Sequence, residues 1–158
     1  MAIDYRPFVF YGGNCRDAFT YYEEVLGGDL FLLSFADAPL EEPVPPEHAD
    51  LIVHAALTTD GAYVMGSDDP TGEFKGIQGM TVSVSVDDTD EAHRVFDALA
   101  DGGRVTAPLT ETFFSPAFGM CVDRFGVPWM IVAASPDLAW PGRVPGHTGG
   151  RKPSASAA

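Results

Sequence analysis

Hydrophobic and polar positions along the chain follow two periods, and these periods occur in the same order twice. Residues 8–11 are a short apolar run of strand length. Residues 15–26 place apolar side chains three and four positions apart, which predicts a helix. Residues 81–86 read Thr-Val-Ser-Val-Ser-Val, a period of two that predicts a strand, and residues 89–100 predict a second helix.

The two strand–helix units are similar over much of their length. An offset of 74 residues places Ala18 on Ala92, and an offset of 65 places Met65 on Met130. Behind each helix the pattern predicts three further strands, at residues 29–35, 51–58 and 62–66 in the first half and at residues 104–108, 119–123 and 127–133 in the second. The predicted fold class is therefore α+β, with two tandem βαβββ modules.

Both predicted helices have similar start and stop signals. Asn14 and Asp88 precede them, each with an acid three positions later, which predicts capping by a polar side chain. Pairs of glycines at 27–28 and 102–103 follow the helices and predict left-handed ends.

We expect one folded domain over residues 1–140, made of modules at about 5–68 and 77–135. Residues 36–49, rich in proline and acids, are expected to form a loop or lid. Residues 141–158 are rich in Gly, Pro and Ser and are expected to form a flexible tail.

Charge and composition narrow the class of protein. The 158 residues carry a net charge of −14, with +3 in the last 18 residues and hence −17 in the first 140, and this acidity argues against nucleic acid and anionic membranes as partners. No apolar run reaches about 20 residues, and the N-terminus lacks a signal-peptide pattern. Two cysteines, Cys15 and Cys121, suit a reduced cytoplasmic protein.

The strand at residues 81–86 has one valine face and one hydroxyl face. We expect the valines to pack under the helices, and Thr81, Ser83 and Ser85 to face whatever the sheet curves around. An ordinary half-exposed strand would have the same alternation. Two such modules side by side commonly enclose a cup.

Two segments resemble a known family: NCRDAFTYYEEVLGGDL in the first half and TETFFSPAFGMCVDRFGVPWMI in the second. They are similar to the vicinal oxygen chelate superfamily of glyoxalase, bleomycin-resistance and extradiol-dioxygenase proteins, and more narrowly to its PhnB-like branch. The resemblance covers roughly residues 6–134. It implies a curved mixed sheet around a cup, and dimers, in some of which two chains share the cup.

In metal-dependent members of this superfamily, four strand residues hold a divalent ion, typically His, Glu or Gln. The resemblance places these positions at about Pro7, Met65, Thr81 and Met130, and a shift of one residue either way brings in no better donors. A thioether suits soft copper rather than a hard or borderline ion. We therefore expect no metal and no other cofactor, which makes a metal-dependent glyoxalase or dioxygenase the least favoured function.

Three other residues are candidates for chemistry. His54 interrupts an apolar strand, either as a hydrogen-bonded structural residue or as a polar group lining the cup, and its place matches a histidine common in the PhnB-like branch. Glu111 is a candidate acid at the cavity edge, or a surface residue. Cys15 starts a helix, where it is either a small buried residue or a thiol activated by the helix dipole.

Aromatic and Met side chains at strand spacing indicate either core or an apolar ligand pocket. The residues expected to line the cup are Tyr11, His54, Tyr63, Met65, Thr81, Ser83, Glu111, Phe113, Phe118 and Met130. We favour a metal-free protein that binds a small organic ligand, most simply as a homodimer. The alternatives are a metal-independent acid–base enzyme using His54 or Glu111, and a structural homodimer without a ligand.

Overall fold

The computed structural model describes residues 3 and 5–135; the predicted tail at 141–158 lies outside the described residues. Each half of the chain forms one βαβββ module, as predicted. The first contains β1 (Phe8–Tyr11), α1 (Cys15–Leu26), β2 (Asp29–Ser34), β3 (Ile52–Thr59) and β4 (Ala62–Asp68), with a short 3₁₀ turn, Pro46–His48, in the predicted loop. The second contains β5 (Val82–Val86), α2 (Thr89–Ala100), β6 (Arg104–Thr110), β7 (Phe118–Val122) and β8 (Pro128–Ala133).

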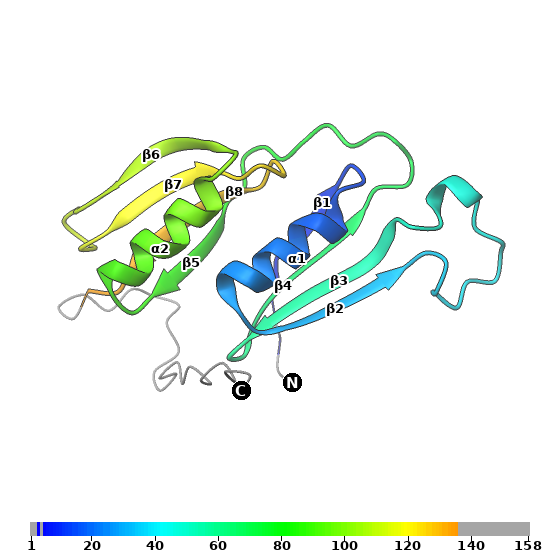
Figure 1. The fold of residues 1–158 in the computed structure, drawn as a ribbon, viewed down its shortest axis with the longest axis horizontal. Coiled ribbons are helices and arrows are strands. Elements are labelled where there is room, and N and C mark those ends of the chain that lie inside the picture. The colour runs from blue at the N-terminus through cyan, green and yellow to red at the C-terminus, as the bar shows by residue number, and fades with distance from the viewer. Residues whose placement is uncertain (1–2, 4, 136–158) are drawn as a thin grey trace, which may run out of the picture.

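Each module forms its own four-stranded mixed sheet, with strand orders β1-β4-β3-β2 and β5-β8-β7-β6. The first strand of each module runs parallel to the last, and the other pairs are antiparallel. The repeated topology confirms the predicted α+β fold with two similar modules. It also places β1 and β5 at sheet edges, where the two modules approach each other (Figure 1).

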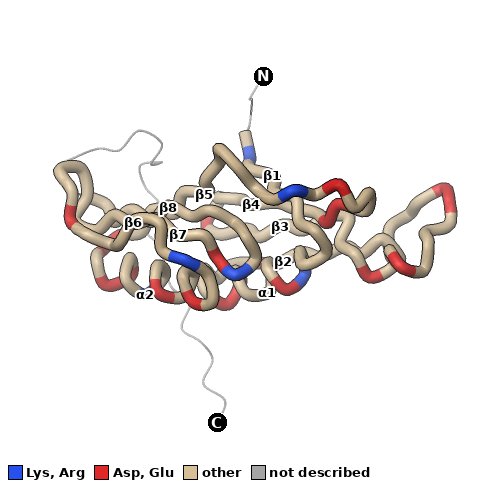
Figure 2. Tube along the Cα trace, turned by 90° about the horizontal axis from the view of Figure 1, so that it is seen from above, with Lys and Arg blue, Asp and Glu red and all other residues tan. Residues whose placement is uncertain are grey.

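The two sheets lie side by side, and both helices cover the same side of them (Figures 1 and 2). Contacts between the helices join the modules: the Tyr21 hydroxyl donates to the Ala98 carbonyl at 2.6 Å, and Arg94 donates to the Val25 carbonyl at 2.9 Å. The opposite side of both sheets carries no helix. We call it the open side, and it is where the predicted cup-lining residues must be sought.

The helix starts follow the predictions with one difference, and at the end of α2 the cap residue Asp101 is extended (φ −63°, ψ 123°) rather than left-handed, with the positive φ one residue later at Gly102. Asp88 caps α2, its side chain accepting the Glu91 N–H at 2.8 Å, but Asn14 makes no side-chain cap at α1. There the carboxylate of Asp68, at the end of β4, accepts the Cys15 N–H at 3.0 Å. The Cys15 N–H at the start of α1 therefore finds its hydrogen-bond acceptor on β4, a contact that local sequence spacing does not reveal.

The second glycine of each pair is required by close backbone approach at equivalent points of the two modules. A Cβ on Gly28 would lie 2.3 Å from the Thr58 carbonyl oxygen, and one on Gly103 would lie 2.1 Å from the Val122 oxygen. Any side chain at these positions would force the turn away from the neighbouring strand.

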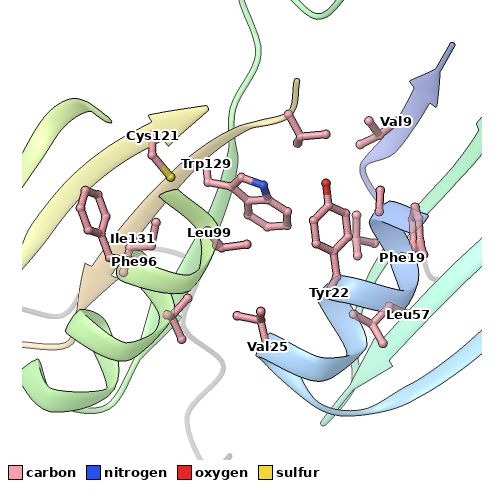
Figure 3. Packing of buried hydrophobic residues seen from close by; sticks show 14 of the residues in the cluster. Val9, Phe19, Tyr22, Val25, Leu57, Phe96, Leu99, Cys121, Trp129 and Ile131 are labelled. Carbon is pink, nitrogen blue, oxygen red and sulfur yellow. The ribbon is translucent and has the colours of Figure 1, made fainter. Parts of the chain in front are cut away.

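The core lies between the helices and the sheets and is continuous across the module boundary. Tyr22 of α1 meets Trp129 of β8 there, with ring centroids 5.0 Å apart in an edge-to-face arrangement (Figure 3). Both side chains are almost fully buried. One shared core therefore holds the two sheets at a fixed relative position.

Candidate functional site

The side chains of β1 alternate between buried and exposed, which distinguishes the helix-covered side of the first sheet from its open side. Val9 and Tyr11 are 5% and 1% exposed and belong to the core under α1, whereas Phe8 and Phe10 are 36% and 56% exposed. Because side chains alternate along a strand, the two phenylalanines point to the open side. Cross-strand pairing places Met65 of β4 beside Phe8 on that side.

Further aromatic side chains continue this surface. Ala56 of β3 pairs with both Met65 and Phe31, so Phe31 of β2 and His54, two residues before Ala56, share the open side. Tyr63, two residues before Met65, also lies there. We call these residues the first-sheet cluster: Phe8, Phe10, Phe31, His54, Tyr63 and Met65. Phe31 is 54% exposed and Tyr63 36%, an unusual amount of aromatic surface facing solvent.

His54 lies between two aromatic rings of the cluster. Its ring centroid is 6.1 Å from that of Phe8 and 6.2 Å from that of Phe31. The two imidazole nitrogens make no hydrogen bond within the described residues. Every buried side-chain nitrogen or oxygen there does have a hydrogen-bond partner, so the His54 nitrogens are not buried and face solvent on the open side. The imidazole is therefore the polar centre of an otherwise apolar surface.

At one end of the cluster, Arg6 covers Tyr63. The Arg6 guanidinium carbon lies 3.5 Å from the centroid of the tyrosine ring, which is cation–π geometry. This contact orders the Tyr63 ring and brings a cation to the end of the cluster.

The open side of the second sheet is apolar as well. A Cβ on Gly119 would lie 2.8 Å from the Phe96 ring of α2, so the neighbouring Phe118 and Met120 point the opposite way. Met120 pairs with Met130, and Met130 with Ser83, which puts all three on the open side. We call Phe118, Met120 and Met130 the second-sheet cluster. The predicted hydroxyl face of residues 81–86 is thus placed as expected, with Ser83 exposed and the valines half-buried.

Six of the ten expected cup residues lie on the open side of one of the two sheets, and three more adjoin β5 or β6 in sequence. His54, Tyr63 and Met65 belong to the first sheet, and Ser83, Phe118 and Met130 to the second, with half-buried Thr81 just before β5 and exposed Glu111 and Phe113 in the loop after β6. Tyr11 is different, because it faces α1. Burial raises its pKa, and its hydroxyl donates to Tyr22 at 3.5 Å, so Tyr11 is a core residue.

A cavity of about 270 Å³ adjoins the first-sheet cluster at the module boundary. Phe8 and Phe10 form one wall, and Phe74, Ile77 and Met80 of the segment between β4 and β5 form another. Gln78 is the polar side chain in this lining. The volume suits one small organic ring system beside the cluster.

Two buried carboxylates that sequence reasoning did not assign hold this surface in place. Asp68 accepts backbone N–H groups from Gly13 and Cys15 at 3.0 Å and from Ile52 at 2.8 Å. These bonds tie the end of β4 to α1 and β3. The predicted strand ended at residue 66, two positions before Asp68, so sequence reasoning left this carboxylate outside the sheet.

Asp123 has the corresponding role between the modules. It accepts the Tyr22 hydroxyl at 2.5 Å, the Trp129 indole N–H at 2.8 Å and the N–H groups of Phe125 and Val127 at 2.9 Å. The residue stands in the motif that carries the family resemblance, but its partner on α1 depends on the tertiary structure. The four donors make it a structural anchor rather than a site on the open side.

The cysteines are core residues. Cys15 is 0% and Cys121 1% exposed. Burial raises the pKa of both thiols, to about 11 for Cys121, and the nearby carboxylates Asp68 and Asp123 raise them further. The dipole of α1 therefore does not produce a reactive thiolate at Cys15.

The open side does not supply the ligands that a divalent ion needs. At the four strand positions nearest the predicted metal site, the cross-strand neighbours are Phe8 with Met65 and Ser83 with Met130. One ring, two thioethers and one hydroxyl do not match the donors preferred by zinc, nickel, manganese or iron(II). Within the described part of the chain, no group of three His, Cys, Asp or Glu side chains is placed to hold a metal ion.

The fold defines a class before any relative is considered: paired βαβββ modules with an open, apolar side. A solved glyoxalase/bleomycin resistance protein/dioxygenase family enzyme from Burkholderia phytofirmans has this fold, with 14% identity, coverage of 82% of this chain and 97% of that chain, and a TM-score of 0.56. Residues 4–132 match the family described as 3-demethylubiquinone-9 3-methyltransferase. The chain belongs to that family, within the glyoxalase/bleomycin-resistance-like fold.

Three relatives support this placement. Protein YjdN of Escherichia coli is 33% identical over 79% of this chain and 91% of its own length. The solved protein PA1353 of Pseudomonas aeruginosa is 42% identical, with a TM-score of 0.78 and coverage of 84% of this chain and 98% of that one. A PhnB protein from Bacillus cereus is 25% identical, with a TM-score of 0.66 and coverage of 84% and 100%. The PhnB-like resemblance is therefore confirmed.

Within residues 3 and 5–135, no helix has the length and hydropathy needed to cross a bilayer.

Proposed function

We propose that the protein binds a flat, mainly apolar small molecule on the first-sheet cluster without a divalent metal. The observation that carries the proposal is the group of solvent-facing aromatic rings around His54. Exposed apolar surface is costly for a monomer and is commonly retained for binding. The two phenylalanines that flank the imidazole offer ring faces to a flat ligand, and the imidazole offers one hydrogen bond to fix its orientation.

Binding would be tested by calorimetric titration with 1-naphthol as the probe, with EDTA present. Phe31→Ala removes one exposed ring and should weaken binding at least tenfold without loss of stability, since the ring is 54% exposed. Leu40→Ala, which removes an apolar side chain that is 48% exposed in the loop between β2 and β3, is the matched control. Unchanged affinity in Phe31→Ala, or binding that requires added metal, would contradict the proposal.

A second candidate function is acid–base catalysis on the bound ligand. It is supported by the solvent-facing nitrogens of His54, which leave the imidazole able to exchange a proton with a ligand. No hydrogen bond or ion pair joins His54 to Glu111 in the described structure, so we assign this role to His54 alone. If the wild type converts a bound ligand to product, and His54→Gln loses this conversion while it still binds 1-naphthol, the result would favour an enzyme over a binding protein.

The family's description names methyl transfer, which needs a methyl donor in addition to the aromatic substrate. We derive no step through such a donor. Incubation of the protein with S-adenosylmethionine and a phenol, followed by mass spectrometry of the product, tests this activity directly. We also propose a homodimer as the functional assembly.

A further inference from the structure

The edge of β5 that faces the first module has no strand beside it in the described part of the chain. β5 pairs with β8, and the Ala134 N–H donates to the Val86 carbonyl at 2.8 Å, so the backbone groups of Val86 point to β8. The backbone N–H and C=O groups of successive residues point to opposite sides of a strand. Those of Ser83 and Ser85 therefore point away from β8, toward the first module, and form an edge with which another extended chain can pair.

A cavity of about 260 Å³ extends along this edge, and we call it the helix-side cavity. The five residues of β5 and the start of β4, residues 62–64, line it from the two sheets. Leu26 of α1 and Val95 of α2 add apolar side chains, which places the cavity toward the helix-covered side of the sheets. β1 does not extend beside residues 62–64, because its pairing with β4 begins at Phe8 and the preceding Pro7 has no N–H to continue it. The helix-side cavity therefore lies between two strand edges.

β5 is the outer strand with the least protection against pairing. β2 begins at Asp29 and has a register shift near its other end, and β6 contains Arg104 and Pro108 and has two register shifts. β1 is faced by the segment between β4 and β5, whose Phe74 ring lies against Gly12. β5 contains only valine and serine and keeps a continuous register with β8. Charges, prolines and bulges are the usual means by which proteins keep an edge from pairing, and β5 itself has none of them.

Charge near the helix-side cavity determines which peptides fit it. The lining holds the ion pair of Arg94 with Glu91, and Arg94 also donates to the Val25 carbonyl near the end of α1. Residues 87–91, which follow β5 directly, include four acids, and Asp60 lies in the turn before β4. On a chain whose net charge is −14, these acids favour a cation on a peptide beside them and repel an acidic peptide.

We propose that β5 binds an extended segment of a partner protein, which pairs with its outer edge as an added strand. Alternate apolar side chains of the segment enter the helix-side cavity, and a Lys or Arg of the segment lies near residues 87–91. Main-chain hydrogen bonds give such a complex its affinity, and the cavity gives it a preference for apolar side chains. The proposal does not depend on the proposed function, because the first-sheet cluster binds its ligand on the open side.

Peptide binding would be measured by fluorescence anisotropy with the full chain and a dye-labelled peptide of sequence KVTVTVK. We expect saturable binding. N-methylation of the valines or of the threonines, whichever set faces β5, should weaken binding about tenfold or more, because it removes the backbone N–H groups. The peptide EVTVTVE, which has the same backbone and the opposite charge, should also bind about tenfold more weakly. Equal affinity for EVTVTVE would contradict the assigned charge preference.

Variants of Ser83 test whether the peptide binds at β5. Ser83→Pro removes an N–H that points away from β8 and so leaves the ladder between β5 and β8 intact, whereas Ser83→Ala keeps the N–H and is the matched control. Ser83→Pro should bind KVTVTVK about tenfold more weakly or worse, Ser83→Ala should bind it as the wild type does, and circular dichroism should show both folded. If Ser83→Pro does not fold, the N-methylated peptides still test the proposal on the wild type. Absence of saturable binding, equal affinity for KVTVTVK and both N-methylated peptides, or equal affinity of the two folded variants would overturn the proposal.

Discussion

Removing one hydroxyl group tests how the modules are locked together. The Tyr22 hydroxyl donates to Asp123 at 2.5 Å, with the two residues 0% and 3% exposed. A hydrogen bond to a charged group contributes about 1.5–3 kcal/mol, and no water can replace it at this depth. Tyr22→Phe should therefore lower the free energy of unfolding by about 2 kcal/mol. For a chain of this length that is a fall in Tm of about 4–8 °C.

Denaturant titration followed by circular dichroism measures the loss, with two controls of the same chemical change. Tyr21→Phe removes a partly buried bond to the neutral Ala98 carbonyl and should cost about 1 kcal/mol. Tyr5→Phe, at a residue 88% exposed, should cost close to nothing. If Tyr22→Phe costs no more than Tyr21→Phe, the Asp123 anchor does not stabilise the module boundary as we argue.

Three further predictions concern the turns and the buried thiols. Gly103→Ala should destabilise the fold more than Gly27→Ala in the same denaturant assay. The new Cβ at residue 103 would overlap backbone, whereas at residue 27 there is open space and the cost comes only from the positive φ of 72°. The reverse order would contradict the close approach of backbone at Gly103. Cys15 and Cys121 should react with a thiol reagent at pH 8 only at the rate of unfolding, and rapid labelling of the native protein would be evidence against their burial. Burial raises the pKa of both thiols in the folded state, so above about pH 9 the thiols of the unfolded chain ionise while those of the folded chain stay protonated. Each thiol should therefore lower the free energy of unfolding by up to about 1.4 kcal/mol per pH unit as the pH rises toward its folded pKa. Chemical denaturation at pH 8 and pH 10 checks this, and equal stability at both would refute it.

Much of the fold was predictable because the sequence contains each signal twice. Both helices begin and end where the apolar period predicted, at Cys15–Leu26 and Thr89–Ala100, and the remaining differences are one or two residues at strand ends. The two glycine pairs marked equivalent turns, which confirmed the repeat before any packing was known. Periodicity is reliable here because one side of each element is buried and the other is not.

The predictions that failed depend on which side of a sheet a residue faces, or on contacts distant in sequence. Tyr11 was expected in the cup, yet it stands one position from Phe10, and a single step along a strand reverses the side. Asn14 was expected to cap α1, but Asp68 takes the neighbouring amide from more than fifty residues away. Asp123 meets Tyr22 only once both modules are packed, so no local pattern could assign the pair.

The central claim is that the open side of the first sheet binds an aromatic molecule without a metal ion. It is tested most directly by following the methyl group of Met65 by NMR in protein labelled with ¹³C-methyl methionine. With EDTA present, titration with 1-naphthol should shift this resonance saturably through the ring current of the bound molecule, and the midpoint of the titration should rise at least tenfold in Phe31→Ala. A Met65 resonance that does not move, or that moves only after a divalent metal is added, would contradict the account.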